Sequence, residues 1–368
     1  MHGNVATRQQ KVLATGSTPA DSAVVATDTA IPRNGRRPTI VILEKELLLG
    51  DGLLRIPAYR ALRHAFPEHR IVSLASRKSA FATTLAPFSR LLVDDALADQ
   101  PFNASYARQR EVVRSFGPLD KVLYFRANLR SVLTLINLYP LANDYVGNSV
   151  GFILRKGVKL NIDLRRRSNA ERFHQMAEIA AGHPLPFDPT LPVLPAAEAR
   201  AAEMLPETQR YFGITTTPLG RAKTWPREGL VAVAGAIRAR GLQPVVMLGP
   251  EETEQRDWFV QNIPEAKIVD IETANGDAAY LLRLFHAVAG RLVGCVANES
   301  GLGHLLATRD TPLLTLAGPT NPFRWKPVTR YWWALRAQQF GSANISSIPS
   351  EAVVKSVTTM IDHAPQRR

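Results

Sequence analysis

The 368-residue sequence predicts an α/β protein made of two successive series of strands and helices. Short apolar runs typical of buried strands alternate with longer stretches of helical periodicity, first from residue 39 and again from residue 211. This alternation is typical of parallel sheets covered by helices on both faces. A chain of this length is also too long for one ordinary hydrophobic core, so two domains are expected.

The first series lies within residues 39–205, the predicted N-terminal domain. Residues 1–38 precede it, are rich in Ala, Thr, Ser and Gly, and predict a disordered tail because they lack apolar periodicity. The strands are expected at residues 39–43, 71–75, 91–95 and 121–125. A loop over residues 44–51 and a helix over residues 52–66 connect the first two strands.

Prolines and alanines accumulate between residues 181 and 206, which predicts a linker or domain edge. The second series, within residues 206–345, is the predicted C-terminal domain. Its elements are expected as strands at 211–216, 244–248, 267–271, 292–297 and 313–317, and as helices at 228–240, 277–289 and 304–308. The segment 346–368 adds a helix at 350–363. The two series predict two Rossmann-like domains facing across a cleft, with a ligand at the strand ends.

Composition is that of a soluble globular protein, with 45% hydrophobic and 21% charged residues. No apolar run approaches the roughly 20 residues of a membrane span. The first 37 residues lack the hydrophobic stretch of a secretory signal. The single cysteine, Cys295, excludes an internal disulfide and lies in a predicted strand, where a small buried hydrophobic residue is expected rather than a nucleophile. These features predict a protein of the reducing cytoplasm.

The formal net charge of +13 and the pI of about 10.2 favour anionic partners. The sign of the charge alone does not choose among nucleic acid, anionic lipid and a phosphorylated substrate. Runs such as Arg165, Arg166 and Arg167 are most often solvated surface. A nucleic-acid-binding protein is the alternative from another functional class, but aromatics are only 7% and no RNA-binding signature is visible.

Two polar turns follow apolar runs in the second half. The first, Asn298 to His304, presents backbone N–H groups and the start of a helix at a strand end, which suits phosphate. The second covers residues 318–322, and its closeness in sequence suggests a neighbouring strand end. His304 is either a ligand-binding residue or an ordinary core or cap histidine.

Three charged residues lie at other predicted strand ends. Asp51, between Gly50 and Gly52, is a candidate general base, and the alternative is that it only caps the following helix. Lys223 is a compact donor for a diphosphate, beside the hydroxyls of Thr215, Thr216 and Thr217. Glu252 is placed to accept hydrogen bonds from ribose hydroxyls, or is simply exposed.

Several other site types are absent from the sequence. It contains no P-loop, no complete Gly-x-Gly-x-x-Gly after the first strand, and no Gly-x-Ser-x-Gly nucleophile elbow. No cluster of cysteines or histidines indicates zinc, so no metal site and no cofactor are predicted.

Taken together, these segments resemble glycosyltransferase family 9, the ADP-heptose:lipopolysaccharide heptosyltransferase family, in order from about residue 40 to residue 357. Residues 49–62 resemble its Gly-Asp and Pro-Ala-x-Arg-Ala-Leu signature, and residues 129–131 its Leu-Arg-Ser segment. Residues 223–226 resemble Lys-x-Trp-Pro, residues 299–304 stand where the family has Asp-Thr/Ser-Gly-x-x-His, and residues 318–320 match Gly-Pro-Thr. Each motif is modest, but five in the right order are fairly specific.

The resemblance implies a GT-B architecture, with the acceptor on the N-terminal domain and the nucleotide sugar on the C-terminal one. It implies an inverting, metal-independent transfer in which Asp51 deprotonates the acceptor hydroxyl and Lys223 neutralises the departing diphosphate. The expected donor-binding residues are Thr216, Thr217, Lys223, Glu252, Glu299, Ser300, Gly301 and His304. The expected acceptor-binding residues are Arg55, Arg60, Arg63 and Arg126.

The implied donor is an ADP-linked heptose, and the implied acceptor is an acidic or phosphorylated saccharide or glycolipid such as lipopolysaccharide core. Such acceptors lie at the inner membrane, which predicts peripheral contact of a cytoplasmic protein with an anionic membrane surface and no nucleic-acid partner. A nucleotide-sugar epimerase, which can share the GT-B architecture, is the enzymatic alternative. The sequence departs from the family at Glu299, which replaces the usual Asp, and at Tyr124 and Arg126, which replace an Asp and a Gln. These departures bear on the identity of the sugars.

Overall fold

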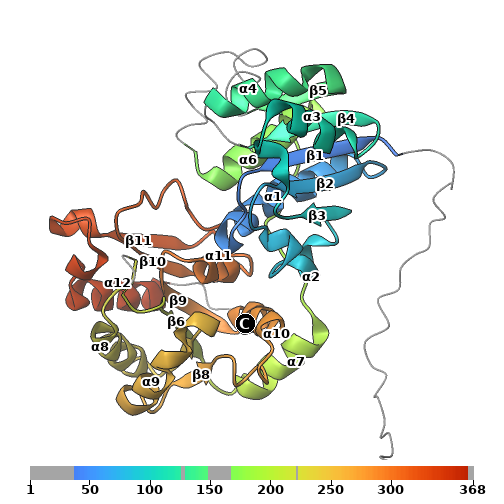
Figure 1. Ribbon diagram of the computed structural model, residues 1–368. Coiled ribbons are helices and arrows are strands. Elements are labelled where there is room, and N and C mark those ends of the chain that lie inside the picture. Colours follow the sequence, from blue (N-terminus) through green and yellow to red (C-terminus); the bar gives the residue numbers. More distant parts are fainter. Residues whose placement is uncertain (1–36, 126–128, 148–166, 221–222, 364–368) are drawn as a thin grey trace, which may run out of the picture. The chain divides into compact units, whose positions relative to one another are not determined.

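The computed structural model describes residues 37–125, 129–147, 167–220 and 223–363, without the side chains of residues 129–132 and 135. Nearly all of the predicted tail, Arg126 and the end of the C-terminal segment lie outside the described residues. The described chain forms two parallel sheets, one in each half of the sequence, with helices between most successive strands (Figure 1).

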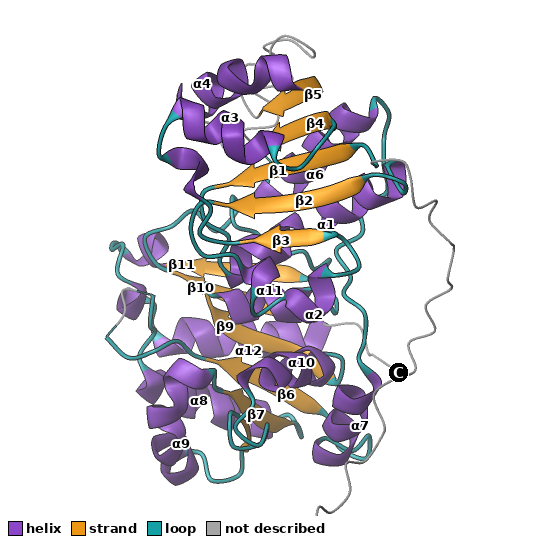
Figure 2. Cartoon of the chain, turned by 45° about the vertical axis from the view of Figure 1, so that its right-hand side comes forward, coloured by secondary structure: helices purple, strands orange, loops and turns teal. Residues whose placement is uncertain are grey.

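The first sheet has the strand order β3-β2-β1-β4-β5, and every pairing in it is parallel (Figure 2). Its strands are β1 (Thr39–Glu44), β2 (Arg70–Ala75), β3 (Asp95–Leu97), β4 (Leu119–Tyr124) and β5 (Ala142–Gly147). The helices around it are α1 (Leu49–Ala65), α2 (Ala86–Ser89), α3 (Tyr106–Arg114), α4 (Leu129–Leu138) and α6 (Asn169–Ala181). Short 3₁₀ turns are η1 (Ala80–Ala82), η2 (Pro101–Asn103) and η3 (Tyr139–Leu141).

Alternate side chains of the central strand β1 serve two separate cores. Ile40 and Ile42 belong to the cluster that includes buried residues of α1 and α6, and Val41 and Leu43 belong to the cluster that includes residues of α3. All of these side chains are fully buried. The apolar run at the start of the sequence therefore forms a strand covered on both faces, as a continuous run of this kind predicts.

The second sheet has the order β11-β10-β9-β6-β7-β8 and is also parallel throughout. Its strands are β6 (Tyr211–Thr215), β7 (Gln243–Met247), β8 (Lys267–Val269), β9 (Leu292–Asn298), β10 (Leu313–Ala317) and β11 (Trp332–Arg336). The helices are α7 (Pro195–Met204), α8 (Arg227–Arg238), α9 (Arg256–Asn262), α10 (Ala278–Ala289), α11 (Gly301–Ala307) and α12 (Ser350–His363). The 3₁₀ turns are η4 (Pro250–Gln255), η5 (Ala337–Phe340) and η6 (Ile345–Ser347).

Four expectations from the sequence were wrong or incomplete. The third strand lies at residues 95–97 and not 91–95, because Leu91 is 62% exposed and lies in the turn after α2 instead of entering the sheet. Helix α1 begins at Leu49, so Asp51 lies in its first turn and not in a preceding loop. The edge strands β5 and β11, which carry mixed polar and apolar residues, were not predicted. Part of the presumed linker forms α7, which begins with Pro195 at a position that suits proline.

The chain order reverses once in each sheet. In the first sheet β2 and β3 lie on one side of β1, and β4 and β5 lie on the other. In the second sheet β7 and β8 lie on one side of β6, and β9, β10 and β11 lie on the other. Ligands of open parallel sheets bind at such reversal points, beyond the carboxyl ends of the strands.

Candidate active site

Asp51 lies at the reversal point of the first sheet, in the first turn of the helix that follows β1. Leu48 occupies the N-cap position of α1, and no side chain caps this helix end by a hydrogen bond. The Asp51 side chain is 26% exposed, and the ion partner found for it within the described chain is Arg55, at 3.4 Å. Among the described residues Asp51 accepts no capping hydrogen bond from a backbone N–H, although its place in the first turn also suits the helix dipole.

Arg55 is buried and is held from three sides. Its Nε and Nη2 donate to the two carboxylate oxygens of Glu44, the last residue of β1, with Nη2 at 3.0 Å. Its Nη1 donates to the backbone oxygen of Asp51 at 2.8 Å. The guanidinium also lies 4.4 Å from the ring centre of Phe173 on α6. Burial acts to lower the pKa of Arg55, but the carboxylates of Glu44 and Asp51 outweigh it and leave the pKa raised, so the group stays charged.

The first turns of α1 and α11 lie against each other. A Cβ on Gly50 would come within 2.9 Å of His304 Cδ2, and a Cβ on Gly301 would come within 3.0 Å of the Leu49 side chain. A side chain at either position would press against its neighbour, so glycine at both positions lets the two turns approach closely. The turn that carries Asp51 therefore lies beside the turn Ser300–His304, as the prediction of a shared site requires.

A chain of polar contacts spans the reversal point of the second sheet. Lys223 Nζ, in the loop after β6, lies 3.0 Å from Glu299 Oε1, directly after β9. Thr320 Oγ1, in the turn after β10, donates to the other carboxylate oxygen of Glu299. The Glu299 side chain is 7% exposed and that of Lys223 is 40% exposed. The carboxylate is thus fixed by two partners, while the Lys223 side chain remains partly exposed.

Thr217 holds the loop that carries Lys223. Its hydroxyl lies 2.9 Å from Thr224 Oγ1 and accepts a hydrogen bond from Asn298 Nδ2 at 3.2 Å, which joins β6 to β9. Thr216 is also buried, and its hydroxyl donates to the Thr217 carbonyl at 3.3 Å. Both threonines lie beside the loop that carries Lys223, and their observed contacts shape that loop.

His304 is buried in α11 and lies next to the start of α1. Burial, with a smaller contribution from the Lys223 charge, lowers its pKa to about 4, so the imidazole is neutral at pH 7. Its Nδ1 is buried and has no hydrogen-bond partner within the part of the chain that the structure describes. Ser300 caps the same helix by accepting from the Gly303 N–H at 3.5 Å. A buried ring nitrogen without a partner is consistent with a ligand-binding role for His304.

Glu252 lies beyond the carboxyl end of β7, the strand next to β6. Its backbone N–H donates to the Gly249 carbonyl at 3.0 Å, and its half-buried side chain folds back over Gly249. Glu252 therefore shares the sheet edge with Lys223 and Glu299, but it occupies a different strand end.

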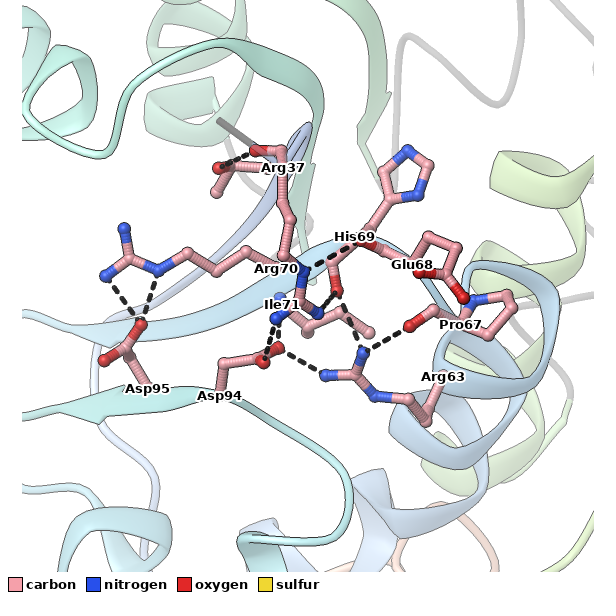
Figure 3. A network of polar contacts seen from close by, with 10 residues as sticks. Arg37, Arg63, Pro67, Glu68, His69, Arg70, Ile71, Asp94 and Asp95 are labelled. Atoms are coloured by element: carbon pink, nitrogen blue, oxygen red, sulfur yellow. Dashed lines mark hydrogen bonds and ion pairs between the residues drawn. The ribbon is translucent and has the colours of Figure 1, made fainter. Parts of the chain in front are cut away.

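Two of the predicted acceptor-binding arginines, Arg60 and Arg63, are held by other groups of the chain. Arg60 pairs with Asp188 at 3.2 Å, and Arg63, at the far end of α1, donates to the His69 carbonyl at 2.9 Å and pairs with Asp94 (Figure 3). That network lies at the amino ends of the strands, because β2 begins at Arg70. Asp51 and Arg63 are twelve residues apart, or about 18 Å along a helix, so Arg63 does not reach the site. Arg126 lies outside the described residues.

A groove of about 730 Å³ lies away from these residues, between α6 and residues 326–330. It includes neither Asp51 nor Lys223 nor Glu299, and charged groups in it such as Asp310 and Arg330 are paired with each other. We therefore place the candidate site at the two reversal points and not in this groove. No cluster of three or more potential metal ligands occurs within the described ranges.

Sequence reasoning missed Glu44, Phe173 and Asn298. A carboxylate that ends an otherwise apolar strand, as Glu44 ends β1, was a signal that could have been used. Phe173 carried no such signal, since an aromatic residue on a helix is usually core. Asn298 was seen as part of the turn after β9, but its contact with Thr217 bridges 81 residues.

Two parallel α/β domains with polar side chains at both reversal points form the GT-B architecture. The sequence model of glycosyltransferase family 9 (heptosyltransferase) matches residues 145–350, which is more than half of the chain. The protein therefore belongs to glycosyltransferase family 9.

Individual relatives agree with this assignment. Lipopolysaccharide heptosyltransferase 3 of Escherichia coli is 24% identical over 329 residues, which cover 82% of this chain and 88% of that protein. The crystal structure of a family 9 glycosyltransferase from Veillonella parvula superposes with a TM-score of 0.62 at 18% identity, covering 88% of this chain and 97% of that one. The E. coli heptosyltransferase WaaC with ADP-2-deoxy-2-fluoro heptose gives a TM-score of 0.58 at 18% identity, covering 87% and 99% of the two chains.

None of the helices that the structure describes combines the length and the apolar character needed to cross a membrane. The buried position of Cys295 confirms its predicted role as a small core residue, and burial raises the pKa of its thiol.

Proposed function

We propose that this protein transfers a heptose from an ADP-linked donor to a hydroxyl group of an acidic saccharide such as lipopolysaccharide core. The main observation behind the proposal is that the first turns of α1 and α11 are in contact. This contact brings the Asp51 turn beside the Ser300–His304 turn. A base for the acceptor and groups for a nucleotide sugar then lie on facing strand ends. The names of the relatives, which include a lipopolysaccharide heptosyltransferase and a structure with an ADP-heptose analogue, support the choice of sugar and nucleotide.

The proposed chemistry is a single displacement. Asp51 takes the proton from the acceptor hydroxyl, and the oxygen attacks the anomeric carbon of the donor. The bond between that carbon and the diphosphate oxygen breaks, and the nucleoside diphosphate leaves with the electron pair. One displacement inverts the configuration at the anomeric carbon. The partial exposure of the Asp51 carboxylate supports its access to an acceptor.

In this proposal Lys223 meets the negative charge of the leaving diphosphate. An ammonium group has three donors, and the partial exposure of Lys223 leaves room for phosphate oxygens beside Glu299. His304 would offer its unpartnered nitrogen, and Ser300 and Gly301 their turn, to the donor. Thr216 and Thr217 would act through the loop, and Glu252 would accept from the ribose. No step in this scheme needs a metal ion, since lysine supplies the countercharge.

The acceptor side of the proposal rests on charge. The net charge of +13 favours a phosphorylated saccharide, and a lipid-linked acceptor would bring the protein to the cytoplasmic face of a membrane. Arg126, which lies outside the described residues, stays a proposed acceptor contact, Arg60 is held by Asp188, and Arg55 has a different role, argued below.

The test is the variant Asp51→Asn, assayed by release of ADP from ADP-heptose in the presence of a phosphorylated core acceptor. Turnover should fall by a factor on the order of 10² to 10⁴, because the amide cannot accept the proton. Asp257→Asn is the matched control, since Asp257 is exposed in the first turn of α9. An Asp51→Asn protein that is folded and transfers sugar at the wild-type rate would refute the assignment.

A further inference from the structure

We infer that Arg55 is a positioning residue for the proposed base Asp51, and that Glu44 fixes it in that role. The inference rests on the proposed function of Asp51. Arg55 is predicted from the sequence to bind acceptor, but only 7% of its side chain is exposed and its donors face this chain's own groups.

The contacts hold the guanidinium in one position and also keep it charged. The Glu44 carboxylate accepts hydrogen bonds from both Nε and Nη2, and this bidentate pairing orients the planar group. Phe173 covers one of its faces at 4.4 Å. These two partners come from β1 and α6, so the position of Arg55 is set by elements outside its own helix.

The remaining edge faces Asp51. Nη1 donates to the Asp51 carbonyl at 2.8 Å and lies 3.4 Å from Oδ1 of its carboxylate. The carboxylate is therefore restrained on the side of the guanidinium, and its exposed part is left to meet an acceptor. A small displacement of a catalytic group can cost about a hundredfold in rate, so a restraint of this kind has a functional effect.

Replacement of Arg55 alone would not distinguish a structural role from a positioning role. Glu44 is 1% exposed, and removal of the arginine would leave its buried charge without the guanidinium, which destabilises the fold. The double variant Glu44→Gln/Arg55→Met removes both charges and separates stability from positioning.

The experiment measures Tm, kcat and the donor KM for Arg55→Met, Glu44→Gln/Arg55→Met and Arg55→Lys. We expect Arg55→Met to lower Tm and the double variant to regain most of it. The kcat should stay at least tenfold below wild type in both, with the donor KM within twofold. Arg55→Lys keeps the positive charge, but an ammonium group lacks the two separate edges with which the guanidinium meets Glu44 and Asp51. We expect this variant to keep its Tm within a few degrees of wild type and still to lose kcat.

A double variant with recovered Tm and wild-type kcat would overturn the inference, because a merely structural role predicts that turnover returns with stability. If the double variant does not regain its Tm, Arg55→Lys decides, and wild-type kcat in that protein overturns the inference. Arg70→Met is the charge-matched control, since Arg70 pairs with Asp95 at the amino end of β2. Asp51→Asn is run beside these variants: if it keeps turnover, the proposed function fails, and if only the Arg55 variants keep turnover, the inference alone fails.

Discussion

Replacement of Lys223 by alanine should weaken binding of the donor far more than it weakens the fold. A hydrogen bond to a charged group contributes about 1.5–3 kcal/mol. Since about 1.4 kcal/mol corresponds to a factor of ten, the Kd for ADP-heptose should rise by roughly 10- to 150-fold. The measurement is titration calorimetry of ADP and of ADP-heptose on the purified variant.

The effect on stability should be small because the Lys223 side chain is 40% exposed. A solvent-screened ion pair contributes about 1 kcal/mol or less, so Tm should fall by no more than a few degrees. Thr320 continues to donate to the Glu299 carboxylate in the variant, which limits the penalty on the buried side. Lys355→Ala, at an exposed position of α12, is the matched control for loss of a positive charge.

A second variant tests the reasoning about the pair. In Lys223→Ala the Glu299 side chain remains next to the expected diphosphate without its lysine partner, which adds repulsion to the lost attraction. Adding Glu299→Gln should therefore recover part of the affinity for ADP. A Kd for ADP within twofold of wild type in Lys223→Ala, in a protein of unchanged Tm, would refute the role of Lys223 in donor binding.

Three further predictions concern the metal, the sugar and acid stability. Transfer should continue at the same rate in EDTA, because the scheme relies on Lys223 for countercharge; loss of activity that Mg²⁺ or Mn²⁺ restores would contradict it. Glu299→Asp should change the ratio of kcat/KM between two competing donor sugars. The shorter side chain cannot keep its contacts with Lys223 and Thr320 and still hold the same sugar hydroxyls. A ratio equal to that of the wild type would leave Glu299 without a role in donor choice. Asp94→Asn should lower Tm at neutral pH, and the difference from wild type should shrink as the pH falls below about 4. Burial acts to raise the pKa of Asp94, but the Ile71 N–H and the arginines Arg63 and Arg37 hold it below its usual range. The stabilisation from the Asp94 charge is therefore complete above the unfolded-state pKa near 3.9 and is lost as the pH falls through the folded-state pKa. A Tm difference that stayed constant down to pH 3 would show that the Asp94 charge does not stabilise the fold.

Most of the buried strands, and the polar residues that follow them, could be predicted from the sequence alone. Apolar runs such as residues 39–43 and 292–297 became β1 and β9 because a run of this kind is stable only when both of its faces are buried. The positions of Asp51 and Glu299 just beyond strands could be predicted for the same local reason. Edge strands such as β11, whose residues are only half-buried, lack that signal and were missed.

Which of these residues meet depends on the fold. Strand order depends on contacts between faces far apart in the sequence, so periodicity could not place Lys223 against Glu299, which are 76 residues apart. Nor could it show that Arg55 is buried between Glu44 and Asp51 while Arg63, two turns later on the same helix, lies in a network at the opposite edge of the sheet. A buried charged side chain has to be paired or hydrogen-bonded, so its role depends on the partner that lies beside it. That partner is set by packing between elements and not by the local sequence.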